Sequence, residues 1–126
     1  VNQHFHVILG RGKLTNHAAD AVVSACSVLK SAGLREQVMV DVSHANSSKQ
    51  HQKQIEVAAN VAQQIAAGDR RITGLMVESH LEEGRQDIVP GQPLKVGVSV
   101  TDACISMAQT VPVLQGLAAA VRARRG

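Results

Sequence analysis

A chain of 126 residues with 44% hydrophobic and 18% charged residues is long enough for one domain with a single hydrophobic core. The net charge is only +3, and Phe5 is the sole aromatic residue. No aromatic side chain accompanies the cations that crowd the C-terminus, Arg122, Arg124 and Arg125, so a nucleic-acid partner is not expected. No apolar run approaches the roughly 18 residues that a membrane span needs, so a membrane partner is not expected either.

Cysteine usage and the start of the chain set two further expectations. Cys26 and Cys104 are too few and too far apart for a disulfide framework or a paired metal motif. Cys26 falls in a helical pattern, where a buried free thiol is the usual outcome, and we therefore expect a cytoplasmic protein. Because the chain begins without methionine and almost inside a strand, we expect it to be a piece of something longer.

The first predicted strand is residues 4–9, HFHVIL, and the glycine-rich turn 10–13 follows it. Apolar residues then recur at helical spacing. Asn16 or Thr15 is expected to cap this helix, and Gly33 is expected to end it.

The order of strand, loop and helix then repeats. Residues 37–42, QVMVDV, are the second predicted strand, and an apolar stripe from Ile55 to Ala66 predicts a helix that Gly68 ends. Residues 72–78, ITGLMVE, are the third predicted strand. This continuous apolar run is typical of a parallel strand that is covered on both faces.

A long connection separates the third and fourth predicted strands. Residues 79–95 hold two of the three prolines, and loops of such length in compact domains are often functional. Residues 96–100, VGVSV, are the fourth predicted strand, and the last helix is expected from about Val111 to Arg124 with Pro112 in its first turn. Four strands with intervening helices predict an α/β fold with one parallel sheet. It could be an open sandwich or half of an eight-stranded barrel.

Functional groups of such folds belong at the carboxyl ends of the strands. The polar residues at these ends are Arg11, Lys13, His44, Glu78, His80 and Asp102. Among them, His44, Glu78 and Asp102 offer nitrogen and oxygen ligands to a divalent metal ion such as Mn, Fe, Co or Zn. Singly, such a histidine is more often a turn residue, and such a carboxylate is more often a helix cap or a solvated loop residue. Their joint placement favours a site.

The polar run after the second strand leaves two interpretations open. Asn46, Ser47 and Ser48 lie before a predicted helix whose first N–H groups need acceptors. They either cap this helix or help to hold an anion there, with Lys49 nearby.

Several stretches carry a resemblance to a known family: HFHVIL, QVMVDVSHANSSKQ, GLMVESHLEEG, GQPLKVGVSVTDACI and the terminal VRARRG. Together they resemble the C-terminal part of class I 3-deoxy-D-arabino-heptulosonate 7-phosphate synthase, also called phospho-2-dehydro-3-deoxyheptonate aldolase. The resemblance covers essentially the whole chain. It implies that residues 1–126 are a single domain, the C-terminal half of a TIM (β/α)8 barrel with four parallel strands and flanking helices.

The resemblance also implies an activity and its metal ligands. The family condenses phosphoenolpyruvate with erythrose 4-phosphate in a metal-dependent reaction, the first step of the shikimate pathway to aromatic amino acids. His44, Glu78 and Asp102 match three of the family's four metal ligands. The fourth, a cysteine near the start of the barrel, is absent here, and neither Cys26 nor Cys104 stands in its place.

Arg11 and Lys13 are the substrate-binding residues that the resemblance implies. The family usually has Arg-Gly-Gly-Lys after the first of these strands, with the arginine on the phosphate of phosphoenolpyruvate, whereas this chain has Gly10-Arg11-Gly12-Lys13. A shift of one residue in a strand turns a side chain to the other face, so Arg11 reaches the phosphate only if the turn is rebuilt.

Two classes of function therefore stay open. The chain is either part of the synthase, inactive alone, or a non-catalytic half-barrel that binds metal or phosphate or serves only as a folded assembly unit. A metallohydrolase is disfavoured because the sequence has no HExxH pair.

Partners are expected at the open edges of the sheet. The expected partner is the missing N-terminal half of the barrel. Because a cut barrel exposes two strand edges and an apolar inner face, we also expect a homo-oligomer, with a two-fold dimer the favoured form. The alternative is a monomer in which loop 79–95 or a helix covers that face.

Overall fold

The computed structural model describes residues 5–10 and 12–126. Along the chain the elements are β1 (Val7–Leu9), α1 (Ala19–Ser31), β2 (Val38–Asp41), α2 (Lys53–Ala66), β3 (Ile72–Met76), β4 (Ser79–His80), β5 (Ile105–Ser106) and α3 (Met107–Arg125). Strands β1, β2 and β3 form a parallel sheet in that order. The chain is therefore an α/β protein with parallel strands, as the sequence predicts.

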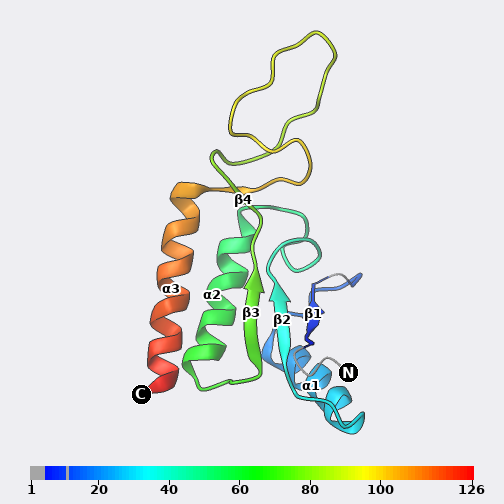
Figure 1. The fold of residues 1–126 in the computed structure, drawn as a ribbon, viewed down its shortest axis with the longest axis vertical. Helices are drawn as coiled ribbons and strands as arrows, with labels where there is room; N and C mark the ends of the chain where they lie inside the picture. Colours follow the sequence, from blue (N-terminus) through cyan, green and yellow to red (C-terminus); the bar gives the residue numbers. More distant parts are fainter. Residues whose placement is uncertain (1–4, 11) are drawn as a thin grey trace.

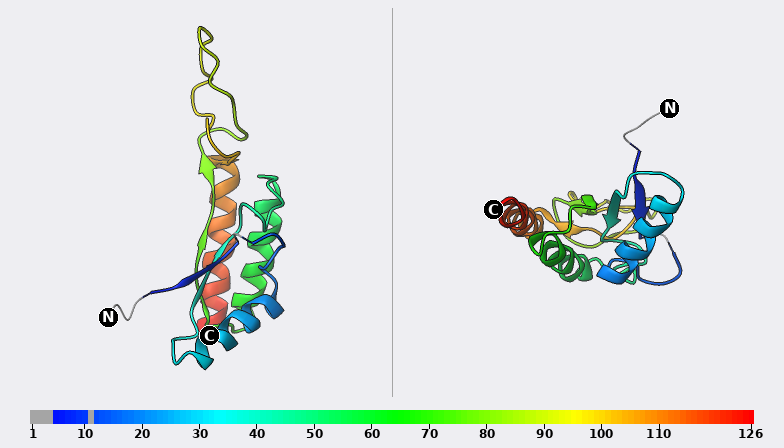
Figure 2. Two further views of the ribbon diagram at one scale, coloured as in Figure 1. Left: turned by 90° about the vertical axis from the view of Figure 1, so that its right-hand side faces the viewer. Right: turned by 90° about the horizontal axis from the view of Figure 1, so that it is seen from below.

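The helices lie on one side of this sheet (Figures 1 and 2). Val38 and Val40 point toward them and are fully buried against α1 and α2. The opposite face carries Ile8, Met39 and Gly74, which are neighbours in the strand register, and Ile8 is 43% exposed. Burial of each core valine contributes about 1.5–3 kcal/mol, so the helix-facing side supplies most of the stability of this part of the chain.

Glycines end the first two helices where the sequence predicts. Gly33 has φ +69°, and the following Leu34 N–H reaches back to the Leu29 carbonyl at 2.9 Å, which satisfies an orphan carbonyl of the last turn. Gly68 follows α2 with φ +106°. The predicted cap of α1 is wrong, because Ala18 is the N-cap and makes no side-chain bond.

Asn16, one of the two residues predicted to cap α1, makes a different contact. The Asn16 backbone N–H donates to Asn46 Oδ1 at 2.6 Å, so this segment ties the chain after β1 to the loop after β2. The N-cap residue of α1 makes no side-chain hydrogen bond to the helix. Asp20 lies in the first turn, where a negative charge complements the helix dipole.

The fourth predicted strand is wrong. Residues 96–100 form no strand, and within them only Ser99 makes an isolated bridge, to Arg85. Gly97 turns the backbone with φ +83°, and Val96 is 88% exposed, so this apolar run lies in the loop. The next parallel pairing is instead β4 with β5, which form a separate small sheet.

Helix α3 begins earlier than predicted, at Met107. A capping box sets this start: the Gln109 N–H donates to Ser106 Oγ at 3.2 Å, and the Ser106 N–H donates to Gln109 Oε1 at 2.8 Å. Pro112 therefore lies inside the helix rather than in its first turn. Helix α3 packs alongside α2 (Figure 1).

The connection between β4 and β5 projects away from the sheet and helices (Figures 1 and 2). The Gln86 side chain organises it: its Nε2 donates to the Lys95 and Val98 carbonyls at 2.7 and 2.9 Å, and its Oε1 accepts from the Lys95 N–H at 2.9 Å. In the described part of the chain, no helix has the length and apolar character needed to cross a membrane.

The turn before β3 is held by Asp69. Its carboxylate accepts hydrogen bonds from the Arg71 backbone N–H, Nε and Nη2 at 2.9, 3.0 and 2.8 Å, and its backbone carbonyl accepts from Arg124 of α3 at 3.0 Å. The hydrogen bonds from Arg71 hold the pKa of Asp69 below its ordinary value. Asp69 thus joins the start of β3 to the end of α3.

We predict that Asp69→Asn lowers the free energy of unfolding by about 1–2 kcal/mol near neutral pH, with allowance for the partial exposure of Arg71. Because the folded-state pKa is depressed, this stabilisation is present above the ordinary pKa of 3.8 and is lost as the pH falls through the folded-state value. Urea denaturation at neutral and acidic pH measures both effects. Asp87→Asn, in an exposed pair with Arg85, is the control, and an equal effect of the two substitutions would refute the prediction.

Candidate metal centre

Asp41 ends β2 and organises the loop that follows. It is fully buried, and its Oδ1 accepts from both the backbone N–H and the hydroxyl of Ser43. Its Oδ2 lies 2.7 Å from His44 Nδ1, and its carbonyl accepts from Asn46 Nδ2 at 2.8 Å. A buried carboxylate needs such partners, so the loop folds around it and fixes the ring of His44.

The backbone of this loop is strained. His44, Ser48 and Lys49 have φ of +48°, +52° and +60°, a region that costs side-chain-bearing residues about 1–3 kcal/mol each. The Lys49 N–H donates to the His44 carbonyl at 2.8 Å, and the Ala45 N–H donates to the Gly10 carbonyl at 3.2 Å. Strain of this kind persists where the surroundings impose it and often marks a functional site.

The capping interpretation of this polar run is wrong. Helix α2 begins at Lys53 after the N-cap residue Gln52, which makes no side-chain cap bond. Asn46 and Ser47 are instead buried within the loop, where Asn46 bonds the Asp41 carbonyl and Ser47 Oγ bonds the His44 carbonyl at 3.3 Å.

Glu78 stands just beyond β3, and its backbone is held from α2. The Glu78 N–H donates to Gln54 Oε1 at 2.9 Å, and Gln54 Nε2 donates to the Glu78 carbonyl at 3.2 Å. The Ile105 N–H donates to the same carbonyl at 3.0 Å. Gln54 is 1% exposed, so these bonds are shielded from water.

Asp102 lies near the C-terminal end of the long connection between β4 and β5. It precedes β5, and its side chain is 71% exposed. Cys104 is buried nearby, with Sγ 3.5 Å from the Asp102 carbonyl. Burial raises the pKa of the Cys104 thiol, and the negative charges of Glu78 and Asp102 raise it further. Cys26 packs in the hydrophobic core beneath the sheet.

His44, Glu78 and Asp102 come together in space. His44 Nε2 lies 3.5 Å from Glu78 Oε1 and 3.9 Å from Asp102 Oδ2, and one ligand atom from each residue lies within 4.8 Å of the other two. If His44 Nδ1 carries the proton and donates it to Asp41, Nε2 presents a lone pair to two carboxylates. A cation would hold such a donor set together.

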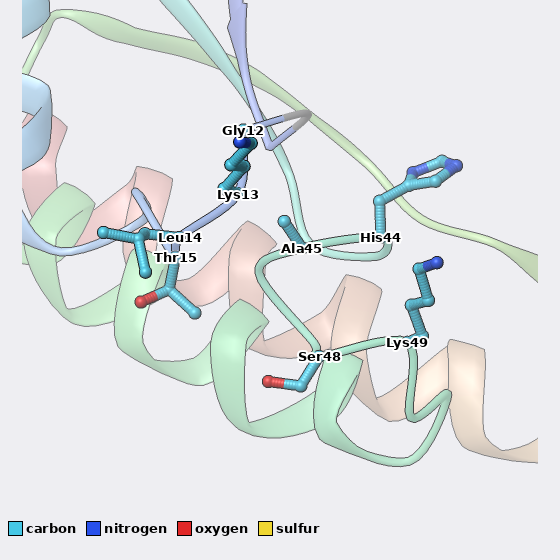
Figure 3. A pocket seen from close by; sticks show the side chains of 8 residues that line it. All are labelled: Gly12, Lys13, Leu14, Thr15, His44, Ala45, Ser48 and Lys49. Atoms are coloured by element: carbon cyan, nitrogen blue, oxygen red, sulfur yellow. The ribbon is translucent and has the colours of Figure 1, made fainter.

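Lys13 lies at a cavity next to this group. The cavity, of about 830 Å³, is lined by Gly12, Lys13, Leu14, Thr15, His44, Ala45, Ser48 and Lys49. Figure 3 shows Lys13 on the segment across from the loop that carries His44 and Lys49. A smaller pocket of about 210 Å³ contains His44, Glu78 and Asp102 and also touches Lys49. His44 and Lys49 therefore line both spaces.

His80, which was also named from the sequence, does not join the group. His80 is exposed, and its Nδ1 accepts from the adjacent Leu81 N–H at 2.9 Å. Arg11 lies outside the described residues. Its neighbour Gly10 has φ +146°, and a Cβ there would lie 2.5 Å from the Asp41 Cβ. In this conformation only glycine fits at position 10, where the family pattern usually has arginine.

The sequence interpretation missed Asp41 and Gln54. Asp41 did carry a signal, because it is the only charged residue in the strand VMVD and stands three residues before His44. Gln54 carried none, since it lies in a run of glutamine and lysine residues at the start of a helix.

Fold and site define a class of protein: a parallel α/β unit that gathers a histidine, two carboxylates and lysines at the carboxyl edge of its sheet, where enzymes of this class bind metals and phosphorylated ligands. The chain belongs to the DAHP synthetase I family, whose sequence profile matches residues 1–115.

Characterised relatives extend this assignment. The Phe-sensitive phospho-2-dehydro-3-deoxyheptonate aldolase of Escherichia coli strain K12 is 53% identical over 125 residues, which are 99% of this chain and 36% of that protein. The tyrosine-inhibited enzyme of Schizosaccharomyces pombe is 49% identical over 96% of this chain and 34% of that protein. The solved phospho-2-dehydro-3-deoxyheptonate aldolase of Francisella tularensis SCHU S4 superimposes with a TM-score of 0.93 at 44% identity, over 99% of this chain and 36% of that structure. The chain thus spans about a third of the length of these relatives.

We predict that Asp41 fixes the tautomer of His44. In the metal-free protein, ¹⁵N NMR of the imidazole should show the proton on Nδ1. Asp41→Asn should abolish this preference, because an amide can donate to Nδ1 as well as accept from it. Asp20→Asn, at an exposed carboxylate on α1, should leave the His44 signals unchanged. A wild-type His44 with its proton on Nε2 would contradict the prediction.

Proposed function

We propose that this chain supplies the metal centre and part of the substrate pocket of a 3-deoxy-D-arabino-heptulosonate 7-phosphate synthase within a longer protein. The observation that carries the proposal is the convergence of His44, Glu78 and Asp102 within 4.8 Å in a chain 53% identical to a phospho-2-dehydro-3-deoxyheptonate aldolase. The reaction is the condensation of phosphoenolpyruvate with erythrose 4-phosphate, the first step toward aromatic amino acids.

The proposed fold of the complete protein is a TIM barrel, of which residues 1–126 form a single C-terminal domain. Three observations support it: the strands are parallel, α1 and α2 cover only one face of the sheet, and the opposite face leaves Ile8 half exposed. In a closed barrel, that second face points inward and packs against the remaining strands. The rest of the longer protein is therefore the proposed partner of this face.

His44 Nε2, Glu78 and Asp102 are the proposed ligands of a divalent ion such as Mn, Fe, Co or Zn, and their mixed nitrogen and oxygen donors fit these metals. When bound, the ion supplies Lewis-acid polarisation of a substrate carbonyl oxygen. Asp41 holds the His44 ring in place by its bond to Nδ1. In the family that the chain resembles, a further metal ligand is a cysteine that lies outside this chain.

Phosphate binding is proposed for Lys13 and, from the family resemblance, for Arg11. Both proposed substrates carry phosphate, and an ammonium group is a suitable partner for its charge. Lys13 and the proposed metal ligand His44 both line the cavity of about 830 Å³, which supports a phosphate position beside the metal centre. A cytoplasmic location is proposed as well, supported by two buried free cysteines. Homo-oligomer formation stays a prediction.

The proposal predicts that Glu78→Gln in the full-length protein weakens binding of Mn²⁺ by at least about 10- to 100-fold and lowers the condensation rate in parallel. The rate is measured by phosphoenolpyruvate consumption at a Mn²⁺ concentration near the wild-type dissociation constant, where a weakened site is largely empty. Glu56→Gln, on the first turn of α2, is the matched control and should behave as wild type. Full activity of Glu78→Gln would exclude the proposed centre, and metal binding with no condensation in wild type would favour the non-catalytic alternative.

We also predict that this chain alone does not catalyse the condensation at the rate of the full-length protein. Orientation of two substrates is worth roughly 7–11 kcal/mol, and a chain that spans 36% of its relative lacks the other side of the pocket. Turnover is compared for the chain alone and for the full-length protein at equal concentration. Equal rates would overturn this prediction.

A further inference from the structure

The hydrogen-bond ladder between β2 and β3 stops just before Glu78. Its last register pair is Asp41 with Met76, and the last backbone bond runs from the Val42 N–H to the Met76 carbonyl at 3.0 Å. After Met76, where β3 ends, the chain no longer pairs with β2. The backbone of Glu78 therefore needs partners other than β2 at the position where its side chain faces His44.

Gln54 occupies the place of the missing strand neighbour. Its side-chain amide accepts from the Glu78 N–H and donates to the Glu78 carbonyl, the same two bonds that a residue of an adjacent antiparallel strand would make with its own C=O and N–H. Glutamine suits this position because one rigid, planar group offers both an acceptor and a donor. Gln54 is 1% exposed, so water has little access to replace either bond.

The contact joins the three segments that carry the proposed ligands. Gln54 lies in the first turn of α2, directly after the loop that holds His44. The Glu78 carbonyl that accepts from Gln54 also accepts from the Ile105 N–H, and Ile105 is three residues beyond Asp102. One carbonyl is thus shared between α2 and the strand that follows Asp102.

We infer that Gln54 is a positioning residue for the proposed metal centre, which sets the place of Glu78 relative to His44 and Asp102 without touching the ion. This inference rests on the proposed function. It adds a residue of α2 that is not itself a proposed ligand to the machinery that determines metal affinity.

Gln64 provides a matched comparison on the same helix. Its Nε2 donates to the His17 carbonyl at 2.7 Å and to Asn60 Oδ1 at 2.9 Å. Gln64 is only partly buried, but like Gln54 it has a side-chain amide that bonds a backbone group from a distant segment. None of its partners carries a proposed ligand, so its loss affects stability and leaves the centre intact.

The test is Mn²⁺ binding by the full-length protein, followed by the electron paramagnetic resonance of free and bound Mn²⁺, in wild type, Gln54→Met, Gln64→Met and His44→Ala. We expect Gln54→Met to raise the dissociation constant by about 10- to 100-fold and to change the visible spectrum of bound Co²⁺, while Gln64→Met leaves both unchanged. If circular dichroism shows that Gln54→Met is unfolded, Gln54→Asn takes its place, because the shorter amide keeps the polarity but does not reach Glu78.

The outcomes separate this inference from the proposed function. Wild-type affinity and spectrum in a folded Gln54 variant, with binding lost in His44→Ala, would overturn the inference alone. An equal loss of affinity in Gln64→Met would also overturn it, since the effect would then come from stability. Unchanged Mn²⁺ binding in His44→Ala would show that the metal binds elsewhere, and the proposed function would fail with the inference.

Discussion

Backbone hydrogen bonding has to change partners at the carboxyl ends of β2 and β3, and the candidate site is built from the groups that make this change. The Asp41 carbonyl accepts a hydrogen bond from the Asn46 amide. The Glu78 N–H donates to the Gln54 amide, and the Glu78 carbonyl accepts from it. Buried backbone groups without partners are costly, so these side chains are required for the fold itself. The same contacts hold His44 and Glu78 facing each other at 3.5 Å. Stability of the sheet edge and geometry of the site therefore depend on one set of bonds.

Asp41 shows how burial and function are combined. A fully buried carboxylate is tolerated only when its oxygens are bonded, and here Ser43 and His44 bond both of them. The strained backbone at His44 is the consequence, because the chain must turn sharply for the ring to reach a carboxylate three residues back. Gly10 allows the first strand to approach closely, since a Cβ there would collide with Asp41. The neighbouring strand is thus adapted to the same carboxylate.

Much of this arrangement could be predicted from the sequence, for a definite physical reason. Parallel strands end at one edge of a sheet, so polar residues that follow apolar runs are brought together there, and His44 and Glu78 met this expectation. Asp102 lies near them although the strand expected before it is absent. Residues 96–100 have the alternation of a strand, but Gly97 breaks the extended backbone and the apolar side chains lie on a projecting loop. Local pattern alone does not reveal whether a surface exists for such residues to pack against.

The supporting residues were the least predictable. Gln54 acts through a contact 24 residues away in sequence, and no periodicity or motif marks one glutamine among several as the buried one. Asn16 was expected as a helix cap, yet its backbone is bonded to Asn46. Both cases depend on which distant segments the fold brings together, which local propensity does not contain.

The central claim is that His44, Glu78 and Asp102 hold one divalent ion. The most direct measurement is anomalous X-ray diffraction from crystals of the full-length protein grown with Mn²⁺, with data collected on both sides of the manganese absorption edge. The account predicts an anomalous peak within coordination distance of His44 Nε2 and of one carboxylate oxygen each from Glu78 and Asp102. A fully occupied Mn²⁺ site elsewhere, with these three side chains unliganded, would contradict it.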